Sequence, residues 1–242
     1  MKVAAIQCKP FTGDIEANKK RHLEFIEIAI KAAADLIYFP ELSITGYEPR
    51  LAKSLATNPE VSFFDDFQNL SDIHQVIIGV GVPLKLRDQI QIGMVWFESG
   101  KPRNTYKKQI LHSDEIPFFQ PGDEQLVLQL GTYRIAPAIC YESLQTSHAD
   151  FAAAKGVNVY LTSVAKPSGG IKKAMAHYPN VASKNNMSVV MANCIGPCDD
   201  FISSGNSAAW DSQGKLIGKM DRESEGILMV DLEKGSTVEL RD

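Results

Sequence analysis

Short apolar runs alternate with longer amphipathic segments along most of the chain. Four of these runs have the length and residue types of buried strands: VAAIQC (3–8), DLIYF (35–39), VNVYLTS (157–163) and MSVVMANC (187–194). After the first run, Leu23, Ile26 and Ile30 recur at helical spacing, and Asp14 stands where a helix cap is expected. The alternation predicts an α/β fold with helices packed outside a sheet.

Two further stretches predict pairs of neighbouring strands. Residues 76–84 and 90–99 flank a short polar turn, and residues 126–130 face residues 133–139 across Gly131. The remaining helices are predicted over about 60–74, 143–155 and 171–185.

The end of the chain predicts strands around the turn sequence DSQG and a last strand, GILMVDL (226–232). No linker, repeat or low-complexity tract interrupts the pattern. We therefore expect one domain over residues 1–242, with mixed sheets and outer helices.

Composition narrows the class of protein. Hydrophobic residues make up 44% and charged residues 22% of the 242 residues, as in ordinary soluble proteins. The net charge is −4, without a basic patch, so no nucleic-acid partner is expected. No apolar run reaches the roughly 20 residues that span a bilayer, and the apolar part of MKVAAIQCKP is too short for a signal peptide. These features predict a cytoplasmic protein with no membrane partner.

Cysteine usage fits a reducing compartment, where the four cysteines are expected to be free thiols. Cys194 and Cys198 raise the question of zinc. Gly196 and Pro197 lie between them, and no second Cys or His pair follows, whereas structural zinc normally needs four ligands. We therefore predict no metal site.

Three chemically active residues follow predicted strands. Glu41 follows LIYFP, Lys108 follows an expected strand, and Cys140 follows RIAPAI just before an expected helix. Sites in open α/β sheets form at the carboxyl ends of strands, and a helix N-terminus lowers the pKa of a thiol. A thiolate nucleophile, a carboxylate proton carrier and an ammonium for the oxyanion make a complete acyl-transfer set.

Each of these residues also has an ordinary structural explanation. Cys140 can be a small buried hydrophobe, Glu41 can bond backbone amides of the next turn, and Lys108 can form a solvated pair with Lys107. A Cys–His hydrolase that uses Cys140 with His148 or His177 is another possibility, but it leaves the FPEL segment without a role.

Three segments together resemble the nitrilase superfamily, the carbon–nitrogen hydrolases. They are ADLIYFPELSITGY around Glu41, the Tyr-x-Lys segment ending at Lys108, and the Ile-Cys-Tyr-Glu segment around Cys140. Their order along the chain is the order in that family, and FFQPGDE and GNSAAWDSQGK extend the similarity over nearly the whole sequence.

The resemblance implies roles and a fold. Cys140 would be the nucleophile, Glu41 the general base and then acid, and Lys108 the oxyanion partner. Glu115 would orient Lys108 or the substrate, although an exposed loop carboxylate is the alternative. In the family, the lysine is the second residue after the tyrosine. That position is Lys108 here, which disfavours Lys107. The implied fold is a four-layer α-β-β-α sandwich with two mixed sheets, and the implied assembly is a homodimer or a higher homo-oligomer.

Substrate binding is the least defined part of the resemblance. The candidate residues are Tyr47, Tyr141, Glu142, Ser163 and Lys166. Many family members have an arginine soon after the cysteine, where this chain has Ser143-Leu144. Lys166 could bind an acidic substrate group or be a solvated surface lysine.

The expected activity is hydrolysis of a small linear amide or carbamoyl compound, with release of ammonia through a cysteine thioester and without a cofactor. Nitrile hydrolysis and acyl transfer to an amine use the same residues and remain alternatives. A non-catalytic relative acting as a binding protein is the alternative from another class.

Overall fold

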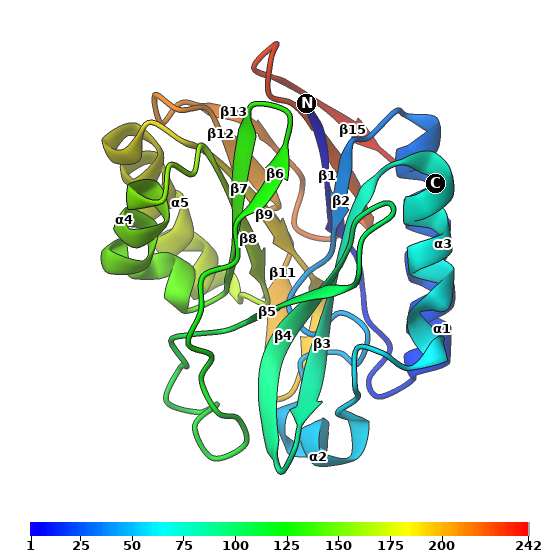
Figure 1. Cartoon of the computed structure of the whole chain (residues 1–242). Helices are drawn as coiled ribbons and strands as arrows, with labels where there is room; N and C mark the ends of the chain where they lie inside the picture. The colour runs from blue at the N-terminus through cyan, green and yellow to red at the C-terminus, as the bar shows by residue number, and fades with distance from the viewer. Residues whose placement is uncertain (242) are drawn as a thin grey trace.

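The computed structural model describes residues 1–241, which form two β-sheets stacked face to face with helices over both outer faces (Figure 1). The first sheet has seven strands in the order β15-β14-β1-β2-β3-β4-β5. Its strands are β1 (Lys2–Gln7), β2 (Leu36–Tyr38), β3 (Ile77–Leu86), β4 (Gln89–Phe97), β5 (Asn104–Lys107), β14 (Gly226–Asp231) and β15 (Ser236–Leu240).

The second sheet has six strands in the order β13-β12-β9-β8-β7-β6. They are β6 (Leu128–Leu130), β7 (Tyr133–Ile139), β8 (Val159–Val164), β9 (Ser188–Asn193), β12 (Ala208–Trp210) and β13 (Leu216–Lys219). A separate ribbon pairs β10 (Ile195–Cys198) with β11 (Phe201–Ser204). In each large sheet the central strands are parallel and the outer ones antiparallel, so both sheets are mixed.

Helices cover the outer face of each sheet (Figure 1). The α-helices are α1 (Ile15–Lys31), α2 (Ala52–Leu55), α3 (Asp65–His74), α4 (Thr146–Ala154) and α5 (Ser168–Asn185). Helices α1 and α3 pack on the first sheet, and α4 and α5 pack on the second. Short 3₁₀ turns, η1 (Pro49–Leu51), η2 (Ser62–Phe64) and η3 (Glu142–Leu144), precede three of these helices.

Apolar side chains fill the space between the two sheets. Tyr38 and Trp96 of the first sheet share one buried cluster with Leu161 and Val190 of the second. The Tyr38 hydroxyl donates a 2.8 Å hydrogen bond to the Val190 carbonyl, so its one polar atom is satisfied inside the core. Burial of each such large side chain is worth about 1.5–3 kcal/mol, and this layer therefore fixes how the sheets sit against each other.

Two outer apolar layers hold the helices in place. Phe25 of α1 and Phe67 of α3 are buried against the first sheet. On the other side, Tyr178 of α5 packs edge-on against Trp210 of β12, with ring centroids 5.4 Å apart. Helix, sheet, sheet and helix therefore follow one another, which confirms the predicted four-layer α-β-β-α sandwich with two mixed sheets.

Most predicted elements are confirmed, with shifted ends. Asp14 caps α1 by accepting a 3.0 Å hydrogen bond from the Ala17 amide. The helix predicted over 143–155 is shorter, because the turn η3 comes first and α4 begins only at Thr146. The prediction that GILMVDL is the last strand was wrong, since β15 follows it and pairs with β14.

The prediction of one domain over 1–242 remains a prediction, and residue 242 lies outside the described residues. Within the part of the chain that is described, no helix combines the length and apolar composition needed to cross a bilayer.

Candidate active site

Polar residues from both sheets meet where their strands end. Glu41 lies just after β2, Lys108 directly follows β5, and Cys140 directly follows β7. Ser163, at the same end of β8, donates a 2.8 Å hydrogen bond to the carbonyl of Phe39. This bond joins the two sheets beside Glu41 and Cys140, so the sandwich itself brings their loops together.

The backbone turns sharply at Cys140. Its φ angle is +47°, a conformation that is uncommon for a residue other than glycine. The Cys140 amide still donates a 3.0 Å hydrogen bond to the Ser163 carbonyl, which continues the pairing of β7 with β8. Such strained positions persist only where the surroundings hold them, and they gather at functional sites.

The predicted lowering of the Cys140 pKa by a helix N-terminus was wrong. The three-residue turn η3, and not an α-helix, follows the cysteine. Desolvation by the surrounding protein and the neighbouring charge of Glu41 raise the pKa of Cys140 to about 12. Lys166 and Lys108 lower the pKa of the same thiol, so its ionisation depends on which of its neighbours are charged.

Lys108 lies between two carboxylates. Its Nζ is 2.7 Å from Oε1 of Glu41 and 2.5 Å from Oε1 of Glu115, and all three side chains are buried. Burial raises the pKa of Glu41, and the ammonium of Lys108 opposes that shift. Although burial acts in the other direction, the two carboxylates raise the pKa of Lys108 above its ordinary value, so it stays an ammonium.

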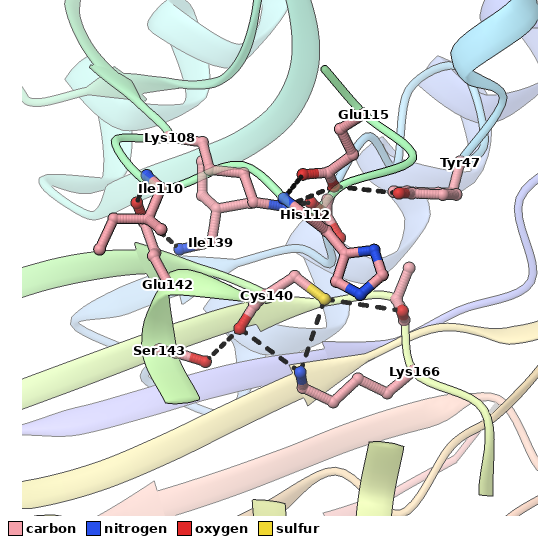
Figure 2. Close-up of polar contacts among 12 residues, drawn as sticks. Tyr47, Lys108, Ile110, His112, Glu115, Ile139, Cys140, Glu142, Ser143 and Lys166 are labelled. Carbon is pink, nitrogen blue, oxygen red and sulfur yellow. Dashed lines mark hydrogen bonds and ion pairs between the residues drawn. The ribbon is translucent and has the colours of Figure 1, made fainter. Parts of the chain in front are cut away.

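Glu115 is held from two sides. The Tyr47 hydroxyl donates a 2.9 Å hydrogen bond to Oε1, and the His112 amide donates a 2.7 Å bond to Oε2 (Figure 2). Only 1% of the Glu115 surface is exposed, so the alternative prediction of an exposed loop carboxylate was wrong. Its bonds fix the carboxylate against Lys108.

A cavity of about 430 Å³ opens above this group. Cys140 and Glu115 are among the residues that line it, and Tyr47, Tyr141 and Phe201 supply aromatic walls. The rings of Tyr47 and Phe201 are 5.6 Å apart. A mainly apolar pocket with a few convergent polar groups is the usual form of a small-molecule site.

Lys166 also lines the cavity. The alternative prediction, that it is a solvated surface lysine, was wrong. It is 3% exposed, and its Nζ lies 3.5 Å from Sγ of Cys140. Figure 2 shows this ammonium on the side of the cysteine opposite to Lys108 and Glu115.

Two of the candidate substrate-binding residues do not line the cavity. Ser163 uses its hydroxyl in the bond to Phe39 described above, and it is fully buried. Glu142 is also fully buried, and its carboxylate accepts hydrogen bonds of 2.6 Å from each of the amides of Ile139 and Gln109. Glu142 therefore connects the end of β7 to the segment that follows Lys108. Ser163 and Glu142 thus stabilise the backbone around the site and do not face the cavity.

The two histidines of the Cys–His alternative lie elsewhere. His148 is hydrogen-bonded to the hydroxyls of Tyr106 and Tyr160, at 2.9 and 2.7 Å. His177 lies on α5. Within residues 1–241 neither ring has a hydrogen bond to Cys140, whose sulfur instead contacts Lys166 and the Ala165 carbonyl. This geometry does not support a Cys–His pair.

Some residues of the site carried no signal of their own in the sequence. Phe201 belongs to the short strand β11, and His112 contributes a backbone amide that any residue could supply. Tyr106 was part of the motif around Lys108, but its bond of 2.7 Å to Glu142 depends on a residue 36 positions away. Within residues 1–241, no three His, Cys, Asp or Glu side chains are grouped to hold a metal ion.

Comparison with known proteins decides the family. The family model for carbon–nitrogen hydrolases matches residues 2–242. The chain belongs to the carbon–nitrogen hydrolase family. The predicted resemblance to the nitrilase superfamily is thereby confirmed.

Relatives within this family have several names. The chain is 26% identical over 96% of its length to the glutamine-dependent NAD(+) synthetase of Thermotoga maritima, but it spans only 42% of that protein. It is 26% identical to the "hydrolase in agr operon" of Staphylococcus aureus, with 100% of this chain and 95% of that protein covered. A nitrilase of Pyrococcus abyssi is 25% identical, with 96% and 90% covered.

Solved structures share the fold. An amidase from Nesterenkonia sp. AN1 superposes with a TM-score of 0.87 at 22% identity, covering 96% of this chain and 92% of that one. This likeness supports the four-layer architecture of the carbon–nitrogen hydrolase family.

Proposed function

We propose that the protein hydrolyses the carbon–nitrogen bond of a small linear amide or carbamoyl compound, releasing ammonia, with Cys140 as nucleophile. The observation that carries this proposal is the position of Cys140 in the lining of a cavity, beside the buried Glu41–Lys108–Glu115 group. Nucleophile, proton carrier and cation are the three components that acyl transfer from an amide needs.

In the first half-reaction, the sulfur of Cys140 forms a bond to the amide carbon, and the thiol proton passes to Glu41. Oε2 of Glu41 is buried and has no hydrogen-bond partner within the described residues, so it is available for that proton. The ammonium of Lys108 stabilises the oxyanion. Glu41 returns the proton to the leaving nitrogen, the carbon–nitrogen bond breaks, and ammonia leaves a thioester on Cys140.

In the second half-reaction, water replaces ammonia. Glu41, again a carboxylate, takes a proton from water while the oxygen attacks the thioester carbon. The carbon–sulfur bond then breaks, the sulfur recovers the proton, and the carboxylic acid is released. Glu115 keeps Lys108 oriented during both steps through the 2.5 Å contact between them.

Ammonia release tests the proposal. A panel of short aliphatic amides, ω-amido acids including glutamine, carbamoyl amines and nitriles would be incubated with the wild-type protein and with Cys140→Ala. We expect ammonia from some amides or carbamoyl compounds and none above background from the variant. Trapping the acyl group on Cys140, detected by mass spectrometry, would identify the thioester.

Cys8→Ala is the matched control, because Cys8 is a buried thiol that the site does not use. It should release ammonia at the wild-type rate. Ammonia release that survives in Cys140→Ala would contradict the proposal, and an inert Cys140 that also fails to react with iodoacetamide would favour a non-catalytic binding protein.

A second candidate activity is use of glutamine, with the ammonia or acyl group passed to another acceptor. The similarity over 96% of this chain to a glutamine-dependent NAD(+) synthetase favours it. Glutamine as the best substrate of the panel, with stimulation by an amine acceptor or a partner protein, would distinguish this activity. Nitriles as the best substrates would instead point to a nitrilase.

We also propose a cytoplasmic homodimer that pairs through the helices covering the sheets. Three of the four cysteines are buried and all four are free thiols, which fits a reducing compartment. One chain has a mass of 26.6 kDa, and light scattering should give twice that mass. A mass equal to one chain would contradict the dimer.

A further inference from the structure

Lys166 is a buried cation without a carboxylate partner. Its Nζ contacts the carbonyl oxygen and the sulfur of Cys140, at 3.4 and 3.5 Å. Within residues 1–241 no carboxylate lies at ion-pair distance from it, whereas Lys108 has two such partners. Burying an unpaired ammonium is costly, so its environment must supply a negative charge.

The backbone holds Lys166 in this position. Its amide donates a 2.9 Å hydrogen bond to Oδ1 of Asn193, and its carbonyl accepts from the Ser203 hydroxyl and the Ser204 amide, each at 3.1 Å. The stem packs against the first turn of α5, where a Cβ on Gly170 would lie 3.2 Å from Cβ of Lys166. The ammonium is therefore directed at the cysteine before any ligand binds.

The four charged side chains around Cys140 sum to zero while its thiol is neutral, but only Lys108 has carboxylates at ion-pair distance. Glu41 and Glu115 are two anions, and Lys108 and Lys166 are two cations. Transfer of the thiol proton to Oε2 of Glu41 would leave two complete ion pairs. Lys108 would pair with Glu115, and Lys166 would pair with the sulfur anion. The transfer creates no net charge, so it avoids the cost of adding a charge to a buried site.

We propose that Lys166 is a further catalytic residue, the counter-ion that stabilises the thiolate of Cys140 while Glu41 holds its proton. The S–H bond breaks, the proton binds Oε2 of Glu41, and the electron pair stays on sulfur, 3.5 Å from the Lys166 ammonium. This role rests on the proposed function only in that Cys140 is the nucleophile.

Other titratable groups face this pair from the surrounding elements. Tyr178 and His177 of α5 lie near Lys166, and the Tyr178 hydroxyl is 2.6 Å from the Ser143 hydroxyl. Tyr47, Glu41, Lys108 and Glu115 face the sulfur from the other side. Among the groups that lower the pKa of Cys140, Lys166 has the largest influence. Burial works against the charge of Lys166, but the nearby Cys140 raises the pKa of its ammonium.

The test is the pH dependence of Cys140 alkylation by iodoacetamide, followed on the Cys140 peptide by mass spectrometry. This readout needs no substrate, so it is independent of whether the proposed amides are turned over. Lys166→Met should move the midpoint of the alkylation profile up by at least about one pH unit, which slows alkylation at neutral pH about tenfold. Lys166→Arg retains the charge and should keep the midpoint near that of the wild type.

Lys172→Met is the matched control, because it removes an exposed charge from the same helix that packs on Lys166. Its alkylation profile should superimpose on that of the wild type. Circular dichroism would establish that each variant is folded. If the profile of a folded Lys166→Met protein also superimposes on the wild type, the proposal is overturned. If the variant raises KM only for amides with a carboxylate, without any change in alkylation, Lys166 binds substrate instead.

Discussion

The ammonium of Lys108 lies 2.7 Å from Oε1 of Glu41, and neither side chain is exposed to solvent. A second carboxylate, that of Glu115, contacts the same ammonium at 2.5 Å. One cation therefore holds two buried anions together, and one of them keeps an oxygen free to exchange protons. The stability of the site and its chemistry consequently depend on the same contact.

Replacement of Lys108 by methionine should therefore affect both folding and activity. The two carboxylates would remain buried without their cation, and loss of one partner from a buried ion pair costs about 3–5 kcal/mol. Urea denaturation should show a loss of that order, and ammonia release should fall by at least about 1,000-fold.

Lys107→Met is the control for this change, because Lys107 is the preceding residue at the end of β5. Its activity should stay within about twofold of the wild type, as for most substitutions away from a site. Equal losses in both variants would mean that Lys108 has no special role.

Glu142→Gln should loosen the connection between the Cys140 and Lys108 segments. The carboxylate accepts four hydrogen bonds, from the hydroxyl of Tyr106 and the amides of Ile139, Gln109 and Ile110, at 2.6–3.2 Å. In glutamine, an NH₂ group replaces one carboxylate oxygen and cannot accept the two hydrogen bonds made to that oxygen. Each buried donor left without an acceptor costs about 1–3 kcal/mol of stability.

The measurements for Glu142→Gln are urea denaturation and the turnover number. We expect lower stability and a lower kcat, with KM changed little because Glu142 does not line the cavity. Glu60→Gln, at an exposed position, should change neither quantity. A normal kcat in Glu142→Gln would contradict the positioning role.

The sequence pointed to the three residues of the proposed chemistry because its signals are local. Glu41, Lys108 and Cys140 each lie in a short motif directly after a strand, and that placement is confirmed. The alternation of strands and helices was also readable, because buried strands and amphipathic helices have different periods. Strands β10 and β15 were missed, since the first contains Gly196 and Pro197 and the second is a half-exposed edge strand.

The environment of Lys166 could not be predicted from its neighbours in sequence. Its position depends on Asn193 of β9 and Ser203 of β11, which come later in the chain. Glu142 and Ser163 were predicted to bind substrate because they lie in segments that match the family. Their side chains turn away instead, toward backbone groups that only the folded sheets bring within reach. Local patterns show which residue types are present, whereas long-range packing decides what they contact.

Gly81→Ala should displace Glu41 without changing it. A Cβ on Gly81 would lie 2.4 Å from the Pro40 carbonyl and 2.7 Å from the Leu42 amide nitrogen, closer than atoms can approach, so the loop must move. Because a misplacement of about 1 Å can cost 100-fold in rate, ammonia release should fall by about that factor. Overpacking should also cost about 1–3 kcal/mol of stability.

The matched substitution for this test is Gly169→Ala, where an added Cβ would meet no atom within 4 Å. It should leave both the rate and the melting temperature close to those of the wild type. Full activity in Gly81→Ala would show that the Glu41 loop tolerates movement.

His22 should make stability depend on pH. Its ring is buried, with Nδ1 2.7 Å from the Asn18 carbonyl and Nε2 2.9 Å from the hydroxyl of Ser43, two residues after Glu41. Asn18 offers an acceptor, so Nδ1 carries the hydrogen and the neutral ring accepts from Ser43. Burial lowers the pKa of His22 to about 3, below its ordinary 6.5.

A histidine whose pKa is lowered on folding contributes stability above the unfolded pKa and loses it as the pH falls. Between about pH 6.5 and 3 the unfolded chain binds a proton that the folded chain does not, so each pH unit costs up to about 1.4 kcal/mol. At pH 5 the loss from His22 alone should be about 2 kcal/mol.

Urea denaturation at several pH values would measure how steeply stability changes with pH, and His22→Gln should reduce that slope. His74→Gln changes an exposed histidine and should leave the slope unchanged. Parallel slopes for wild type and His22→Gln would mean that His22 is protonated in the folded protein, and that its bond to Ser43 has a different donor.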